Sequence, residues 1–152
     1  MSSPRIDTTL QDEHWPDVDD LVLPAVMAGL AVIDAPRIQD ELSIVLSDDA
    51  QVQALNRQYR SKDKPTNVLS FPMPPESGLM GDVIFARETI EREAVTQGKS
   101  FTDHFTHLLI HGLLHLHGFD HQTDTDADDM EQREIAALAQ LGIDNPYQTT
   151  NR

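Results

Sequence analysis

A long apolar segment in the second half of the chain constrains the fold more than any other feature. Residues 100–118 read SFTDHFTHLLIHGLLHLHG, and their apolar side chains recur on several faces of a helix rather than along one stripe. Such a helix must be covered on most of its sides, because an apolar surface left in water is unfavourable. We therefore predict a helix that runs through the core and ends at Gly118.

Strands and helices that can cover this segment are indicated along the rest of the chain. Runs rich in β-branched residues predict strands, whereas helical spacing of apolar residues and terminal cap residues predict helices. The flanking residues Pro65 and Pro72 place the second strand at a sheet edge. Thr125 and Asp128 suggest a capping box for the last helix. The predicted strands are 42–47, 67–72 and 82–86, and the predicted helices are 21–33, 50–60, 87–98, 100–118 and 125–142.

The length and the residue usage point to one intracellular domain. A chain of 152 residues has the size of about one domain, and the alternation of strands and helices without repeats predicts an α+β, or mixed α/β, fold. The absence of cysteine excludes a disulfide framework and is compatible with a reducing cytoplasm. No signal-peptide pattern and no apolar run of membrane-spanning length occurs. We expect a soluble cytoplasmic protein without a membrane partner.

The charge is strongly acidic, with one local exception. The formal net charge is −15, from 26 acidic and 11 basic residues, which argues against a broad surface for nucleic acid. Residues 57–64, RQYRSKDK, hold four of the eleven basic residues: Arg57, Arg60, Lys62 and Lys64. This cluster either complements the carboxyl end of a helix or binds an anion, and the charges alone favour neither interpretation.

The segment HGLLHLHGFDH, residues 111–121, has the spacing of a three-histidine metal site. On a helix, His111 and His115 lie on one face with Cβ atoms about 5–6 Å apart, so both imidazoles can reach one ion. Gly118 can adopt the left-handed conformation that ends the helix and returns His121 toward the same ion. We predict one metal ion held by His111, His115 and His121.

The other histidines are not predicted to bind this ion. His107 continues the same helical stripe, but it lies about 12 Å along the axis from His115 and can only support or pack against the site. His104 and His117 fall off the chelating face or lack a partner, and His14 stands alone near the N-terminus. We expect structural roles for these three.

Three neutral imidazoles are typical of a catalytic metal site. They leave a coordination position open, where an ion can lower the pKa of bound water to about 7 and polarise a carbonyl or phosphoryl oxygen. Zinc peptidases with an HExxH motif carry their general base where this chain has Gly112. Either another residue is the base, or the substrate needs less help, or the reaction is not peptide hydrolysis. Asp120 is a candidate base or a partner of a ligand, and it can equally be a solvated turn residue.

Several separate segments resemble the YbeY family of bacterial endoribonucleases. The resemblance covers roughly residues 40–147 in conserved order and spacing, whereas the first 40 residues add little. Its departures from the family pattern are minor, such as His117 where an apolar residue is usual. The segments are KDKPTNVLSFP (62–72), GDVIFA (81–86), HGLLHLHGFDH (111–121), DDMEQRE (128–134) and LGIDNPY (141–147).

This resemblance implies a fold and an activity. It implies a single domain over residues 1–152, with a small, mostly four-stranded sheet packed by helices and one zinc ion on His111, His115 and His121. It implies metal-dependent cleavage of single-stranded RNA, maturation of the 3′ end of the small-subunit ribosomal RNA, and ribosome quality control. The family's functionally important arginine falls on Arg60, in the YR pair before KDKPTNVLSFP.

Two other functions are compatible with the residues themselves. A metallopeptidase is suggested by the histidine spacing and by the predicted edge strand at 67–72, which can pair with an extended peptide. The replacement of its glutamate by Gly112 counts against it. A non-catalytic ribosome assembly factor with structural zinc is the second alternative, and the open coordination position counts against that.

Overall fold

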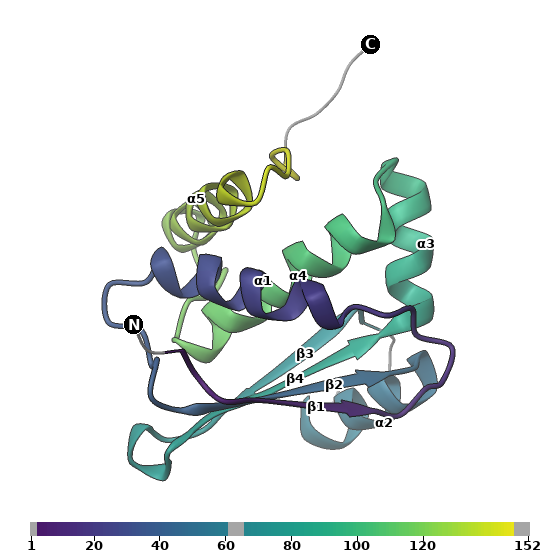
Figure 1. The fold of residues 1–152 in the computed structure, drawn as a ribbon, viewed down its shortest axis with the longest axis horizontal. Coiled ribbons are helices and arrows are strands. Elements are labelled where there is room, and N and C mark those ends of the chain that lie inside the picture. The colour runs from purple at the N-terminus through teal and green to yellow at the C-terminus, as the bar shows by residue number, and fades with distance from the viewer. Residues whose placement is uncertain (1–2, 61–65, 148–152) are drawn as a thin grey trace.

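The computed structural model describes residues 3–60 and 66–147, and it has the α+β architecture expected from the sequence. One four-stranded sheet carries helices on both faces (Figure 1). Within the described residues, no helix is long and apolar enough to span a membrane. The elements are β1 (Ile6–Leu10), α1 (Asp19–Ala31), β2 (Glu41–Ser47), α2 (Asp49–Arg60), β3 (Val68–Pro72), the 3-10 turn η1 (Pro75–Ser77), β4 (Leu79–Ala86), α3 (Arg87–Gln97), α4 (Phe101–Leu116) and α5 (Asp124–Gln140).

The sheet is mixed and has the strand order β1-β2-β4-β3. Strands β1, β2 and β4 are parallel, whereas β3 pairs antiparallel with β4 and forms an edge. Pro72, which has no N–H to donate, is the last residue of β3. The edge position predicted for this strand is therefore confirmed.

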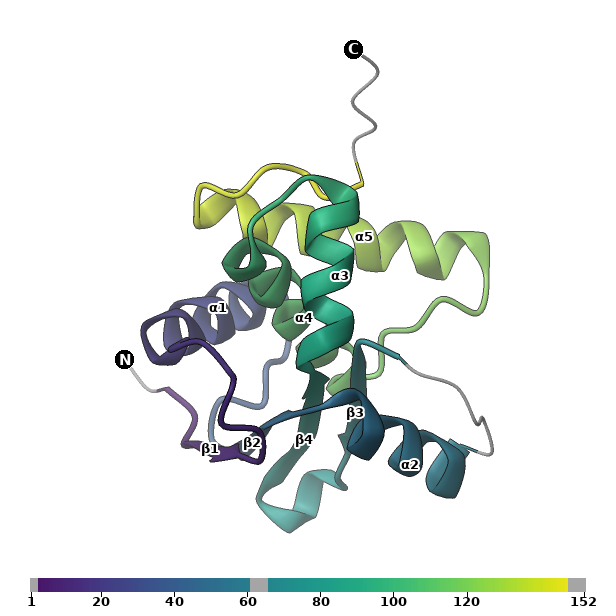
Figure 2. The same cartoon turned by 90° about the vertical axis from the view of Figure 1, so that its right-hand side faces the viewer.

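Helices α1 and α4 lie over one face of the sheet, and α2 lies under the other face (Figure 1). Helix α5 packs on α1 and α4 from outside, and α3 packs along the first part of α4 (Figure 2). Helix α4 is thus surrounded by the sheet and by three helices. The prediction of a core helix is confirmed.

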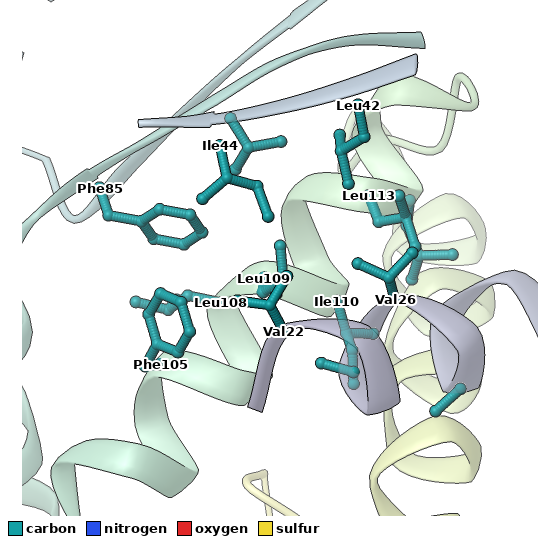
Figure 3. Close-up of a cluster of buried hydrophobic side chains, with 14 of the residues drawn as sticks. Val22, Val26, Leu42, Ile44, Phe85, Phe105, Leu108, Leu109, Ile110 and Leu113 are labelled. Carbon is teal, nitrogen blue, oxygen red and sulfur yellow. The ribbon is translucent and has the colours of Figure 1, made fainter. Parts of the chain in front are cut away.

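The main core fills the space between the sheet and the pair α1 and α4 (Figure 3). Apolar side chains of α4 point both toward β2 and β4 and toward α1. Burial of large aliphatic and aromatic side chains is the dominant stabilising contribution to such a layer, at roughly 1.5–3 kcal/mol per side chain. The α4 side chains with no exposed surface are Phe105, Leu109, Ile110, Leu113 and Leu114.

Most helix bounds differ from the prediction by one or two residues, as for α1, which was predicted at 21–33, and three further differences have a physical reason. Strand β1 was not predicted, because four of its five residues are exposed at the sheet edge and no apolar alternation marks it. Strand β4 begins at Leu79 rather than at residue 82, since Gly81 pairs with both Leu42 and Pro72. Helix α5 begins at Asp124, one residue earlier than predicted, and its N-cap is Thr123, so the cap predicted at Thr125 and Asp128 was wrong.

Gly112 sets how closely α4 approaches the sheet. A Cβ atom at this position would lie 2.8 Å from Val83 Cγ1 and 3.1 Å from Ser70 Oγ. Both neighbours are buried residues on β4 and β3. Because β-branched Val83 has little rotamer freedom, the helix itself must move to admit a larger residue.

We expect Gly112→Ala to destabilise the protein by about 1–3 kcal/mol, the usual cost of overpacking a core. The better helix propensity of alanine offsets up to about 1 kcal/mol of this cost. Gly29→Ala in α1 is the matched comparison, because its Cβ would lie 2.7 Å from the rotatable Leu113 Cδ2. Denaturant unfolding should give the larger loss for Gly112→Ala, and equal losses would contradict a rigid contact at Val83.

Candidate metal centre

The end of α4 forms the turn on which the metal centre depends. Gly118 has a φ of +95°, a backbone conformation that residues with a side chain rarely adopt. The N–H of Gly118 donates to the carbonyl of His115 at 3.0 Å, and the N–H of Phe119 donates to that of Leu114 at 3.1 Å. These two bonds form a Schellman motif, which reverses the chain after the helix as predicted.

Tertiary contacts fix the segment that follows this turn. Phe119 packs against the main hydrophobic core. The guanidinium of Arg133, on α5, lies 4.6 Å from the centroid of the Phe119 ring, and Arg133 Nη1 donates to the carbonyl of Val32 at 2.5 Å. The turn is therefore held by α1, α4 and α5 together.

His111, His115 and His121 come together as the sequence predicted. Their candidate ligand atoms all lie within 4.8 Å of one another, and this group could hold a metal ion. His111 Nε2 lies 3.1 Å from His115 Nε2. The ring of His121 lies nearly parallel to that of His111, with centroids 5.1 Å apart. The third ligand is thus supplied by the turn, while the first two are supplied by the last part of α4.

The environment keeps His115 in the form that binds metal. Burial, with further contributions from His111 and His121, lowers the pKa of His115 to about 4. The imidazole is therefore neutral near pH 7, and a neutral ring nitrogen offers the lone pair that a metal ligand requires.

A buried carboxylate, Glu134 on α5, lies directly behind His111. Its Oε2 accepts a hydrogen bond from His111 Nδ1 at 2.7 Å, and its Oε1 accepts one from His107 Nε2 at 2.6 Å. The hydroxyl of Tyr147 also donates to Oε1. Burial by itself would raise the pKa of Glu134, but the hydrogen bonds from His107 and His111 lower it to about 2. The supporting role expected of His107 thus operates through Glu134.

The sequence analysis did not identify Glu134 or Tyr147 as parts of the site. Glu134 lies in a helix rich in acidic residues, most of which are exposed. One signal was available: Glu134 is four residues after Met130 on the face of α5 that both residues bury. An acidic residue on an apolar helical face indicates a buried partner.

A cleft of about 410 Å³ opens at the histidines. One wall is the edge strand β3 and the segment before it, and the other is the end of α4 with the turn that follows. Besides the histidines, Ser70 and Asp120 are among the polar residues that line the cleft. The lining residues are Thr66, Asn67, Val68, Ser70, Pro72, His111, His115, Gly118, Phe119 and Asp120.

Asp120 lines the cleft as an exposed carboxylate. The backbone N–H of His121 donates to Asp120 Oδ1 at 2.8 Å, and this bond holds the pKa of Asp120 below its usual range. An ionised carboxylate at this place can accept a proton or a hydrogen bond. Its part in a reaction stays a prediction.

The remaining histidines have other partners. His104 Nε2 lies 2.8 Å from Glu93 Oε1, in a pair separate from the metal centre. His117 Nδ1 donates to the carbonyl of Leu113 at 2.9 Å, and its Nε2 accepts from the backbone N–H of Arg37 at 3.1 Å. His14 bonds Asp12 on the surface. None of these three belongs to the described metal-binding group.

The basic cluster is only partly within the described residues. Helix α2 ends at Arg60 as predicted, and the side chain of Arg60 and residues 61–65 lie outside the described part. Helix α2 packs on the face of the sheet opposite to α4 (Figure 1). The backbone of Arg60 is thus separated from the histidine face by the edge of the sheet.

Comparisons with known proteins agree with this architecture. A protein named Endoribonuclease YbeY from Azorhizobium caulinodans is 47% identical, with 94% of this chain and 96% of that protein covered. A protein of the same name from Rhizobium etli is 43% identical over 97% of this chain and 95% of its own length. A solution structure from Thermotoga maritima, 19% identical, shares the fold with a TM-score of 0.59 over 97% of this chain and 99% of that one.

The family model described as Endoribonuclease YbeY matches residues 9–142. This range includes the segments on which the resemblance rested, except that it ends at residue 142, within the last of them. Toward the N-terminus it extends through α1 to the end of β1, where the sequence alone gave little support. The chain belongs to the YbeY family.

Proposed function

We propose that this protein is a zinc-dependent endoribonuclease that cleaves single-stranded RNA. We further propose that it acts in the cytoplasm, where it matures the 3′ end of the small-subunit ribosomal RNA and takes part in ribosome quality control. Its partners in this proposal are the ribosome or components of the small subunit. The observation that carries the proposal is the three-histidine group, of which His111 and His115 line a cleft, in a chain whose relatives are named endoribonucleases.

The donor set suits zinc. In a tetrahedral zinc site with Zn–N bonds of about 2.0–2.1 Å, two ligand nitrogens lie about 3.3 Å from each other. The His111 and His115 Nε2 atoms are already 3.1 Å apart. His121 is exposed on the turn and completes the set. We propose one zinc ion per chain, with His111, His115 and His121 as its ligands.

A zinc ion with three imidazole ligands supplies a Lewis acid and lowers the pKa of a water molecule that it binds. The chain's own residues bind and orient the substrate around it. The Asp120 carboxylate is placed to hold a proton or a hydroxyl group at the rim of the cleft, and we propose that it assists in this way. Ser70 and Asn67 offer polar groups on the opposite wall.

We propose that Arg60 binds a phosphate of the RNA and stabilises charge that develops on its oxygens. A guanidinium can hold a phosphodiester with two parallel hydrogen bonds, which a lysine ammonium cannot. An acidic chain needs a local cation to bind RNA, and residues 57–64 are the dense basic segment of this sequence. Because α2 and α4 lie on opposite faces of the sheet, a strand bound at both places passes over the edge strand β3.

The two alternatives fit the geometry less well. In an HExxH peptidase a glutamate occupies the position of Gly112, but here a Cβ alone would already meet Val83 and Ser70. A glutamate is therefore excluded by packing as well as absent from the sequence. A purely structural zinc site has four protein ligands, whereas the group found among the described residues has three.

Purified protein should cleave single-stranded RNA and leave casein intact, and a chelator should abolish the cleavage. Readdition of zinc should restore it. Cleavage that persists after complete removal of the metal would contradict a metal-dependent reaction. Casein cleavage without RNA cleavage would favour the peptidase, and no activity on either, with zinc bound, would favour a structural ion.

Replacing His115 should remove most of the bound zinc, because two imidazoles cannot retain an ion as three do. We expect elemental analysis to show about one zinc per chain in the wild type and a large loss in His115→Ala. His14→Ala is the control, since His14 is exposed and outside the group. Unchanged zinc content in His115→Ala would exclude this ligand set.

Replacing Arg60 should reduce RNA cleavage without loss of zinc. Arg60→Ala is expected to lower turnover about tenfold or more, which corresponds to a transition-state contact of ~1.4 kcal/mol. Arg60→Lys should also lose activity, because lysine cannot make the bidentate contact. Zinc content and melting temperature serve as controls. Wild-type turnover in folded, zinc-loaded Arg60→Ala would show that the phosphate is bound elsewhere.

A further inference from the structure

We propose that Glu134 is a positioning residue of the metal centre, which holds the His111 imidazole in the tautomer and orientation that direct Nε2 at the ion. This inference rests on the zinc site of the proposed function. Glu134 does not touch the ion or the substrate in this arrangement. It acts through His111, and it is itself held by His107 and Tyr147.

The hydrogen bonds of Glu134 determine the tautomer of His111. An ionised carboxylate can only accept hydrogen bonds. His111 Nδ1, 2.7 Å from Glu134 Oε2, must therefore carry the proton. In neutral His111 the lone pair then lies on Nε2, the atom that faces His115 Nε2 at 3.1 Å. In the opposite tautomer the proton would occupy the metal-facing nitrogen.

Glu134 is fixed in place more firmly than a carboxylate on a helix surface. The residue has no exposed surface. Its Oε1 accepts from His107 Nε2 at 2.6 Å and from the Tyr147 hydroxyl, while Oε2 accepts from His111. All three donors come from elements other than α5, so the carboxylate connects α5, α4 and the C-terminal segment. A side chain held at both oxygens cannot rotate away from His111.

A role at the metal explains why a charge is buried here at all. Burying an ionised carboxylate carries a large desolvation cost, and apolar side chains of similar volume often stabilise a core as well or better. A divalent cation bound to His111 would offset this desolvation cost, because the Glu134 carboxylate would then lie close to a positive charge on the other side of the imidazole. Carboxylates that bond ligand histidines in this way orient the ring and raise its basicity.

His107 and Tyr147 complete the arrangement. Burial lowers the pKa of His107, so its ring is neutral and donates through Nε2. Its Nδ1 is buried without a hydrogen-bond partner within the described residues, as expected when the ring's only proton lies on Nε2. Tyr147 lies beyond residue 142, where the match to the family model ends. The C-terminal segment thereby supports the metal centre.

The test compares Glu134→Gln with Glu93→Gln in the full-length chain. Glutamine keeps the volume and one acceptor but removes the charge and the second acceptor. Glu93 is the matched control, because it bonds His104 on the same helix α4 at 2.8 Å without reaching a metal ligand. The primary readout is the zinc dissociation constant, measured by competition with a chromophoric chelator. The second readout is the melting temperature of each metal-free protein.

We expect Glu134→Gln to weaken zinc binding by about 10–100-fold, the usual effect of losing such a partner. Glu93→Gln should keep wild-type affinity. Metal-free Glu134→Gln should melt below metal-free wild type, because three donors bond the carboxylate and glutamine removes one acceptor. Zinc affinity therefore separates the two roles, since a purely structural role predicts the lower melting temperature with wild-type zinc affinity. Wild-type affinity in Glu134→Gln, or an equal loss in Glu93→Gln, would overturn the proposal.

The wild-type protein provides a test that does not depend on folding of the variant. Long-range ¹H–¹⁵N NMR of the metal-free protein should show His111 protonated at Nδ1, and protonation at Nε2 would overturn the proposal. These measurements need no RNA. Failure of wild type to bind zinc would refute the proposed function, whereas zinc binding that is indifferent to Glu134 would refute only this inference.

Discussion

The burial of α4 between the sheet and three helices is the constraint on which the rest of the structure depends. Its apolar side chains contribute to nearly every part of the main core. Gly112 lets the helix approach β3 and β4 so closely that a single added carbon would meet Val83. This contact places the end of α4, and with it His111 and His115, against the wall formed by the edge strand. The cleft is a consequence of that packing.

Helix α4 also carries polar groups into the core, and each has a partner. His104 pairs with Glu93 on α3, while His107 and His111 share Glu134 on α5. In each pair one imidazole nitrogen bonds a carboxylate oxygen, whereas Nδ1 of His104 and Nδ1 of His107 are buried without a hydrogen-bond partner within the described residues. The polar pairs lie on the faces of α4 that α3 and α5 cover, while its apolar side chains fill the core. The same helix can therefore form the core and support the candidate metal centre.

The position of β3 bears on what the cleft can bind. As an edge strand it forms one wall of the cleft, and among the described strands it pairs with β4 alone. The wall opposite carries Asp120 and the histidines, and the strongly acidic surface disfavours a nucleic acid except where cations gather. This agrees with the proposed cleavage of single-stranded RNA, because a rigid duplex would have to contact more of an acidic chain.

The sequence by itself determined the core helix, the edge strand and the three histidines that the fold brings together as a candidate metal site. These are local properties: helical spacing places His111 and His115 together, and a glycine permits the turn that returns His121. Only the tertiary structure decided the rest. β1 is a strand because β2 lies beside it, since its own residues IDTTL show no apolar alternation. Glu134 lies 23 positions after His111, and Tyr147 lies 40 positions after His107. Their contacts depend on how α5 and the C-terminal segment pack on α4, and the local sequence does not show which residues will meet.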